Sequence, residues 1–429
     1  MLQTFVSLFK NKEIRGKIFF TLAMLLIYRI GSGIPVPGVD AVALSEQISD
    51  NSILSMMNML GGGALEQLSI FAMGVTPYIT ASIIVQLLSM DVIPTLSEWA
   101  KSGQTGRQKI EKTTRYLSIV LAFVQAFSLV YGFDKQYGIL SSSALSSYLY
   151  TATVLCAGTA FLVWIGDRIS MKGIGNGISI IIFGGIVSNM PSQVTQVYSI
   201  LTGGSTNGEI FNGILQFALY LLMVLVIVVF VVIMETAQRK IPVQYTKSVS
   251  TRGGKNDVTF LPLKINSASV IPVIFASSIM TAPQIIISFF NTDLYTKLST
   301  FLSLNKPIGL CIYAVLTILF TFFYTDLQVD PEKMADNLKK SDAYIPGIRP
   351  GADTKKYLHK VLNRITVLGA LGLTFVAVLP YLLPMFTSIP TSAAIGGTGI
   401  IIVVGVAKET IGQLKGQLTQ KQYHGFLNN

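Results

Sequence analysis

Side chains that commonly perform chemistry are scarce in this 429-residue sequence. It contains two histidines, His359 and His424, and two cysteines, Cys156 and Cys311. The histidines fall in polar segments and the cysteines in separate apolar ones, so no nucleophile–base pair, disulfide framework or zinc-ligand spacing is recognisable. We expect the cysteines to be small buried hydrophobes. The sequence therefore predicts a protein that is not an enzyme and that carries no metal ion or cofactor.

One glycine-rich segment, KGIGNGISIII (residues 172–182), has the composition of a phosphate-binding loop. It lacks the Lys-Ser/Thr ending of a P-loop, and no G-x-x-x-x-G-K-[ST] pattern occurs elsewhere in the chain. It also follows no predicted strand, whereas a dinucleotide site needs a strand before the glycines. We therefore interpret it as the start of an apolar helix.

The composition of the chain and its long apolar segments are typical of a membrane protein. The chain is 51% hydrophobic and 12% charged, against roughly 25% charged residues in soluble domains. The apolar runs are long and rarely interrupted by charge, which favours helices over a β-barrel. Ten runs are predicted to span a membrane, with approximate bounds 16–34, 71–90, 116–133, 148–166, 174–190, 213–234, 268–290, 307–326, 365–384 and 395–411. The predicted fold class is an all-α polytopic membrane protein of ten transmembrane helices in two inverted five-helix halves.

The distribution of basic residues predicts the orientation. If the chain crosses the membrane at each run, 28 of its 32 Lys and Arg residues fall on the side that holds both termini. Because cytoplasmic loops are enriched in Lys and Arg, both termini are predicted to be cytoplasmic. The net charge of +11 then reflects topology, with contact to anionic lipids, rather than nucleic-acid binding.

Ionisable side chains are almost absent from the predicted spans. Arg29, near the outer end of the first span, is the main exception. Ion-coupled transporters usually keep charged or titratable residues at mid-membrane depth, and a carbonyl filter such as TVGYG is also missing. The remaining interpretation is a passage with an apolar lining, for which a partner protein must supply the energy of transport. A small-solute transporter built from inverted repeats is the alternative, and an intramembrane charged cluster would favour it.

Two long polar loops, 235–267 and 327–364, hold 14 of the 28 basic residues on the predicted cytoplasmic side. Topology alone would account for their charge. It would not account for their length, because loops beyond about 12–15 residues tend to be functional or disordered. The alternating segment IPVQYTKSV in the first loop also predicts a hairpin strand. A docking surface for an acidic partner such as ribosomal RNA is therefore a second interpretation.

A short apolar segment, ILSMMNML (residues 53–60), precedes three glycines and a longer apolar run. It is too short to cross a bilayer, which needs about 20 residues in a helix. Methionines adapt to irregular surroundings and glycines permit a hinge. The segment is therefore either a static re-entrant piece or a movable one.

Six motifs, taken in order, resemble one family, the bacterial SecY proteins that form the central channel subunit of the Sec translocon. They cover nearly the whole chain and are RIGSGIPVPGVD, GGALEQLSIFAMGVTPYITASIIVQLL, GIGNGISIIIFGGIV, LPLKINSASVIPVIFASSI, ADNLKKSDAYIPGIRPG and GGTGIIIVVGVAKE. The resemblance implies a passive, hourglass-shaped protein-conducting channel in the bacterial plasma membrane. Such a channel translocates unfolded secretory polypeptides and releases membrane segments sideways into the lipid.

The resemblance also implies roles for residues near the pore. The family's plug matches Ile53, Leu54, Met56, Met57, Met59, Leu60, Gly61, Gly62 and Gly63. The family's central ring of apolar side chains matches Val75, Ile79, Ile182, Ile186, Ile274 and Ile402. Val75 departs from the more usual isoleucine and is one methylene smaller, so we expect it to loosen the seal slightly. By residue type alone, each ring residue would be an ordinary core or lipid-facing aliphatic.

The family opens laterally between its second and seventh helices. The matching faces contain the polar residues Thr80, Gln86, Gln125, Ser277 and Ser278. Polar side chains at membrane depth also pair across helices in static bundles, so routine helix–helix contact is the alternative for each of them.

The implied partners are SecE and SecG as further subunits, with the SecA motor or a translating ribosome as the drive. Signal sequences and nascent polypeptides are the implied clients. Arg349 in GIRPG matches the family's arginine for productive contact with SecA. Lys247, Arg252 and Lys255 are further docking candidates, although the tip of their loop departs from the family pattern.

The predicted organisation divides the chain into consecutive segments. In order these are a cytoplasmic N-terminus (1–15), a first five-helix half (16–190) with the plug at 53–63, an external hinge loop (191–212), a second half (213–411) with docking loops 235–267 and 327–364, and a cytoplasmic tail (412–429).

Overall fold

The computed structural model describes residues 11–39, 61–90, 92–140, 142, 144–203, 207–245, 259–288, 301–302, 304, 306–386 and 397–427. The described residues are mainly helical. Their helices are α2 (Lys12–Ser32), α5 (Thr76–Leu88), α6 (Pro94–Lys101), α7 (Gly103–Tyr137), α8 (Leu145–Lys172), α9 (Gly177–Thr202), α10 (Asn207–Thr236), α11 (Ile271–Ser288), α13 (Pro307–Gln328), α14 (Pro331–Lys340), α15 (Ala352–Phe386) and α16 (Gly397–Leu427).

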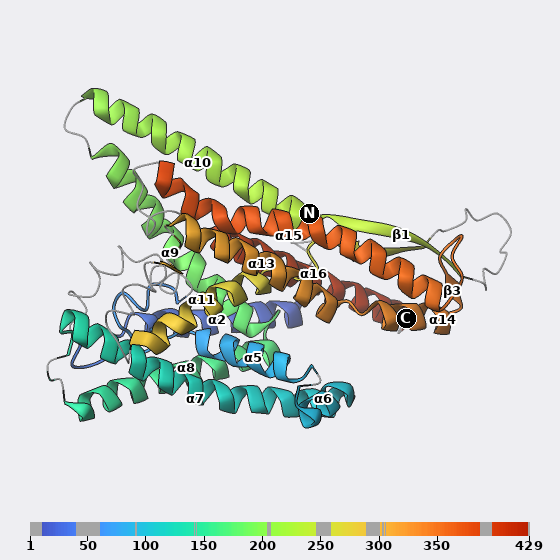
Figure 1. Ribbon diagram of the computed structural model, residues 1–429, viewed down its shortest axis with the longest axis horizontal. Helices are drawn as coiled ribbons and strands as arrows, with labels where there is room; N and C mark the ends of the chain where they lie inside the picture. Colours follow the sequence, from blue (N-terminus) through green and yellow to red (C-terminus); the bar gives the residue numbers. More distant parts are fainter. Residues whose placement is uncertain are drawn as a thin grey trace.

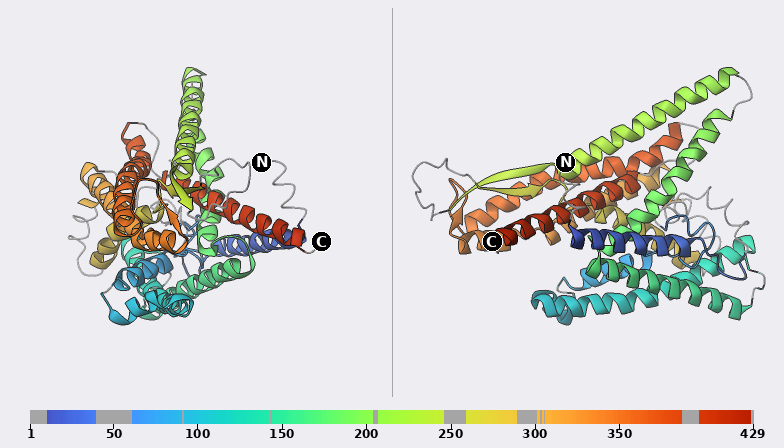
Figure 2. Two further views of the ribbon diagram at one scale, coloured as in Figure 1. Left: turned by 90° about the vertical axis from the view of Figure 1, so that its right-hand side faces the viewer. Right: turned by 180° about the vertical axis from the view of Figure 1, so that it is seen from behind.

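The long helices form two groups that run in broadly the same direction. Helices α5 to α8 lie together on the lower side of Figure 1, and α10, α13, α15 and α16 lie on the upper side. The view from behind in Figure 2 shows the same division. Helices α9 and α11 join the groups, because α9 packs against α8 and α10 while α11 packs against α7 and α13.

All ten predicted spans fall on helices. Six helices among the described residues are long and apolar enough to cross a membrane: Gly103–Lys135, Leu145–Lys172, Gly177–Thr202, Phe211–Thr236, Pro307–Lys340 and Ala352–Leu379. Thr76–Leu88 and Ile271–Met280 are shorter apolar helices. The remaining two predictions correspond to α2, which carries charged residues near both ends, and to α16, which carries them from Lys408 onward.

The structure corrects the expected loop at 191–212. Helix α9 continues through Pro191 to Thr202, and α10 begins at Asn207. Membrane helices tolerate an internal proline when other groups satisfy the local backbone. The carbonyl that loses its N–H partner at Pro191 is that of Val187, one turn earlier. The Thr195 hydroxyl lies after the proline, 3.2 Å from the Pro191 carbonyl oxygen and 2.8 Å from that of Ser192, to which it donates.

A small antiparallel sheet joins the two long loops. Strand β1 (Gln238–Tyr245) pairs with β2 (Thr259–Lys264) in the first loop and with β3 (Ala343–Tyr344) in the second, which gives the order β2-β1-β3. The sheet and α14 lie at the same end of the bundle as α6 (Figure 1). The hairpin strand predicted from IPVQYTKSV is confirmed over residues 241–245, and residues 246–249 lie outside the described residues. The two loops are joined by the sheet.

The glycine-rich segment is the beginning of a helix, as predicted. The Asn176 side chain caps α9 by accepting a hydrogen bond from the backbone N–H of Ile178 (3.1 Å). A Cβ atom on Gly177 would lie 1.9 Å from the Gly166 carbonyl oxygen, so the glycine permits close packing of α9 on α8. The cysteines differ from expectation, because Cys156 is only half-buried and Cys311 is exposed.

Candidate functional site

The six residues predicted to form an apolar ring come together where the two helix groups meet. Five of them are buried in a single hydrophobic cluster, and Ile79 is partly buried against it. The six come from α5 and the residue before it, α9, α11 and α16, and they are Val75, Ile79, Ile182, Ile186, Ile274 and Ile402. Segments separated by more than 300 residues in the sequence therefore contribute to the same hydrophobic cluster.

Helix α9 supplies two neighbouring members of this cluster. Ile182 and Ile186 are four residues apart, so they project from the same face of the helix. Their exposed fractions are 5% and 2%. The cap at Asn176 and the tight α8–α9 contact fix where this face points. A constriction made of such side chains excludes water and ions by dewetting.

A glycine turn lies beside the cluster. Gly62 and Gly63 have positive φ angles of 70° and 82°, a region that L side chains rarely adopt. The Tyr28 hydroxyl donates a hydrogen bond to the Gly61 carbonyl (2.9 Å), and the Arg29 guanidinium donates one to the Gly62 carbonyl (2.9 Å). The turn is thereby fixed to α2.

The same turn packs against α9 without room for side chains. A Cβ atom on Gly62 would lie 2.7 Å from the Tyr28 hydroxyl and 2.9 Å from Cα of Gly185. A Cβ atom on Gly63 would lie 2.9 Å from Oδ1 of Asn189. The predicted plug residues 53–60 lie outside the described residues, so this turn is the described part of that segment.

Sequence reasoning noted Arg29 as an unusual charge but gave it no role, and it missed Tyr28. The available signal was the charge itself, because an arginine inside an apolar run usually has a specific partner. Its partner here is a backbone carbonyl in a turn, which no residue pattern marks. The aromatic ring of Tyr28 also stacks on Phe71, with ring centroids 6.1 Å apart.

We expect Tyr28→Phe to reduce thermal stability by about 1 kcal/mol, because it leaves the buried Gly61 carbonyl without the Tyr28 hydroxyl. Thermal unfolding of the purified protein measures the change. Tyr150→Phe is the matched control, since that ring is 54% exposed. Equal stability of the two variants would contradict a role for the Tyr28 hydroxyl in holding the turn.

The five residues proposed for a lateral gate lie on three packed helices. Helix α11, with Ser277 and Ser278, packs against α5 and α7, which carry Thr80, Gln86 and Gln125. The Thr80 hydroxyl donates to the Thr76 carbonyl (3.1 Å) and that of Ser277 to the Ile274 carbonyl (2.8 Å). The Gln86 side chain is hydrogen-bonded to Tyr324 on α13. The structure therefore brings the three helices together, and the Gln86 contact links α5 to α13, outside the proposed gate.

The loop candidates divide between described and undescribed residues. Arg349 is exposed in the turn before α15, and the buried Thr354 hydroxyl donates to its carbonyl (2.9 Å). Lys247, Arg252 and Lys255 lie outside the described residues. Within the described ranges, His, Cys, Asp and Glu side chains form no group of three or more suited to a metal ion.

Comparison with known proteins shows which family the chain resembles in sequence. The SecY family model matches residues 69–411. The Bacillus subtilis protein translocase subunit SecY is 47% identical over 433 residues, with 100% of both chains covered. The Staphylococcus carnosus protein translocase subunit SecY is 46% identical over 429 residues, with 99% of both chains covered.

Solved structures share the fold at lower identity. A protein-conducting channel has a TM-score of 0.65 and 20% identity, covering 93% of this chain and 91% of the other. Sec61 in the canine ribosome–channel complex from the endoplasmic reticulum has a TM-score of 0.62 and 19% identity, with the same coverage. The sequence matches extend over almost the whole chain and establish that it is a member of the SecY family.

Proposed function

We propose that this membrane-embedded chain is the protein-conducting subunit of a translocase. It provides a passive path for unfolded secretory polypeptides and a lateral exit for membrane segments. The observation that carries the proposal is the apolar cluster of Val75, Ile79, Ile182, Ile186, Ile274 and Ile402, which both helix groups build together. An aliphatic ring seals against ions by dewetting and can yield to a bulky chain of any sequence.

Photocrosslinking at Ile182 tests this function. A photoreactive residue there is expected to react with the middle of a stalled secretory chain, and deletion of the signal sequence should abolish the reaction. The matched control is a probe at Ile200, which lies on the same helix α9 but is 45% exposed away from the cluster. If neither probe reacts while the complex is folded and engaged, the small-solute transporter becomes the better interpretation.

The proposed location is the bacterial plasma membrane with both termini in the cytoplasm. The excess of Lys and Arg on one side supports this orientation. In that orientation the end of the bundle that carries the sheet and α14 faces the cytoplasm. SecE and SecG are the proposed companion subunits, and SecA or a ribosome, together with signal sequences, are the proposed partners. Anionic lipids are further proposed partners, because they attract the Lys and Arg residues on the cytoplasmic side.

The proposed plug, residues 53–63, closes the outer side of the ring and swings on its glycines. The contacts of Tyr28 and Arg29 with the carbonyls of Gly61 and Gly62 support a fixed pivot at this point. The proposed lateral gate lies between α5 and α11. Hydrogen bonds between membrane helices are worth about 0.6–2 kcal/mol, so any that polar side chains form across this gate are weak enough to break and form again.

Arg349→Glu is expected to reduce SecA-driven translocation at least about tenfold without lowering thermal stability. The side chain is exposed, so its replacement disturbs no packing, while reversal of charge repels an acidic partner surface. Translocation of a purified preprotein into proteoliposomes measures the effect. Lys356→Glu, an equal charge reversal at an exposed position near the start of α15, is the control. Equal losses in both variants would indicate general electrostatics rather than a specific contact.

A further inference from the structure

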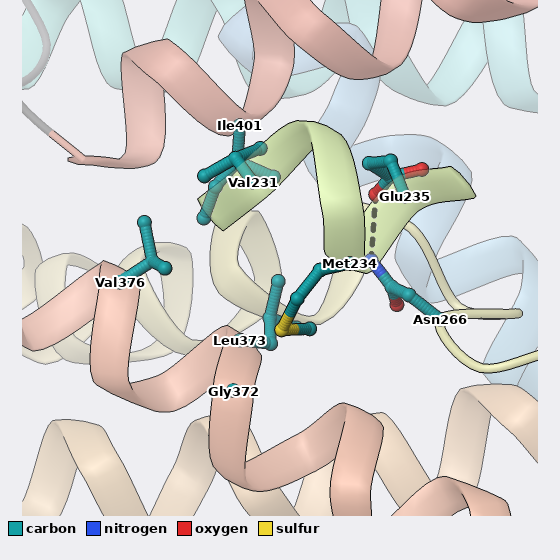
Figure 3. A pocket seen from close by; sticks show the side chains of 8 residues that line it. All are labelled: Val231, Met234, Glu235, Asn266, Gly372, Leu373, Val376 and Ile401. Atoms are coloured by element: carbon teal, nitrogen blue, oxygen red, sulfur yellow. Dashed lines mark hydrogen bonds between the residues drawn. The ribbon is translucent and has the colours of Figure 1, made fainter. Parts of the chain in front are cut away.

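A buried polar cluster outside the apolar ring has no role in the function described so far. The Glu235 carboxylate near the end of α10 accepts a hydrogen bond from Asn266 Nδ2 at 2.7 Å (Figure 3). The two residues are only 7% and 4% exposed. Burying a charge in this way is costly unless it is compensated.

Two lysines, Lys408 on α16 and Lys264 at the end of β2, attract the Glu235 carboxylate electrostatically. The Lys408 ammonium is buried and attracted electrostatically to Glu235. Neither Lys408 Nζ nor Asn266 Oδ1 has a hydrogen-bond partner among the described residues. A cavity of about 10 Å³ lies beside Glu235 and Asn266, close to the least volume that holds one water molecule. We call Glu235, Asn266 and Lys408 the polar joint.

The polar joint lies at the base of the β1–β2 hairpin. Glu235 precedes β1 by three residues and Asn266 follows β2 by two. Between them, the Ile265 backbone N–H donates to the Ala237 carbonyl (3.1 Å), which closes the hairpin base. Helix α15 supports this base closely, because a Cβ atom on Gly369 would lie 2.5 Å from the Ile265 carbonyl oxygen.

The polar joint also lies close in sequence to two helices that carry ring residues, α11 and α16. Asn266 lies five residues before the start of α11, whose first turn contains Ile274. Lys408 follows Ile402 on α16 by six residues, about 9 Å along a helix. Ile401, the neighbour of Ile402, lines the cavity itself (Figure 3).

We propose that Glu235, Asn266 and Lys408 are positioning residues for the pore, which hold α11 and α16 in the closed arrangement and link them to the docking hairpin. This inference rests on the proposed function, since it assigns the closed state to the apolar ring. A partner that moves the hairpin would strain the joint and thereby bias the ring toward opening. The hydrogen bond between Asn266 and Glu235 is a discrete contact that can be either made or broken, and the buried Lys408 ammonium is attracted to the same carboxylate.

The test uses the full-length protein in proteoliposomes and compares Glu235→Gln, Lys408→Met and the double variant. Each single variant leaves one buried group without its counter-charge, so thermal stability should fall. The double variant removes both charges and should recover most of that stability. We expect it nevertheless to keep a resting ion flux about tenfold above the unaltered protein and to accept preproteins with defective signals.

Measuring thermal stability and resting ion flux separately shows whether the polar joint positions the pore helices or only stabilises the fold. The charge-swapped variant, Glu235→Lys with Lys408→Glu, should lower the resting flux again because it restores an opposite-charge pair. Lys12→Met, at an exposed lysine of α2, should change neither readout. A double variant with recovered stability, ordinary flux and ordinary signal discrimination would overturn the proposal. Crosslinking at Ile182 tests the channel function separately, so failure of the joint alone can be recognised.

Discussion

Replacing Ile182 and Ile186 together by serine should raise the resting ion flux at least about tenfold and relax the requirement for an intact signal sequence. Both side chains are buried in the apolar cluster, where hydroxyl groups would allow water to wet the constriction. Removing aliphatic bulk also leaves a cavity, with a cost of roughly 2–5 kcal/mol for each large-to-small change. Both effects weaken the closed state.

Ion flux through proteoliposomes and translocation of a signal-defective preprotein measure the two outcomes. The matched control is the double variant Val187→Ser with Ile200→Ser, because both residues lie on α9 and are 38% and 45% exposed. Ile182→Leu with Ile186→Leu keeps the volume and should keep the seal. An unchanged ion flux in the folded serine variant would contradict the assignment of these isoleucines to the ring.

The second large effect is expected for Gly62→Ala, which should lower stability by at least about 3 kcal/mol and raise the resting flux. A positive φ angle costs an L residue about 1–2 kcal/mol. The new methyl group would also lie 2.9 Å from the backbone Cα of Gly185, which cannot rotate away. The turn would have to leave α9, and with it the proposed pivot of the plug.

Gly38→Ala separates the two causes. Gly38 has a φ angle of 86°, but no heavy atom lies within 4 Å of the position of its Cβ atom. The Gly38→Ala variant should therefore lose only about 1–2 kcal/mol of stability, from the backbone strain, and its resting ion flux should stay low. If thermal unfolding gave equal losses for Gly62→Ala and Gly38→Ala, the close contact with α9 would have no energetic weight.

The existence of the helices could be predicted from sequence better than their ends. Hydropathy reports which residues lie in lipid, and a helix can continue beyond them. Helix α7 begins at Gly103 rather than near residue 116, in a stretch where Arg115 pairs with Glu111 (3.7 Å) and with Asp167 on α8 (2.6 Å). Polar pairing of this kind leaves no apolar pattern.

Some residues of the candidate site could be predicted from sequence and others could not. The ring residues could be named from motifs that resemble a family, but residue type alone does not separate them from other aliphatic residues. The polar joint was missed because Glu235 and Lys408 are 173 residues apart and each ends an apolar run, where a charge is ordinary. The pairing of β1 with β3 was missed because β3 has only two residues.

That pairing has a consequence for how the protein is made. Gln244 and Tyr344 are opposite each other in the sheet and are hydrogen-bonded at 3.0 Å, yet they are 100 residues apart in the chain. At about 5–20 residues per second, β1 emerges from the ribosome roughly 5–20 s before its partner. Helices α11 and α13 are synthesised in that interval. The surface proposed for docking is thus completed only after β3 has been made, so a copy whose synthesis stops before residue 344 lacks one strand of that surface.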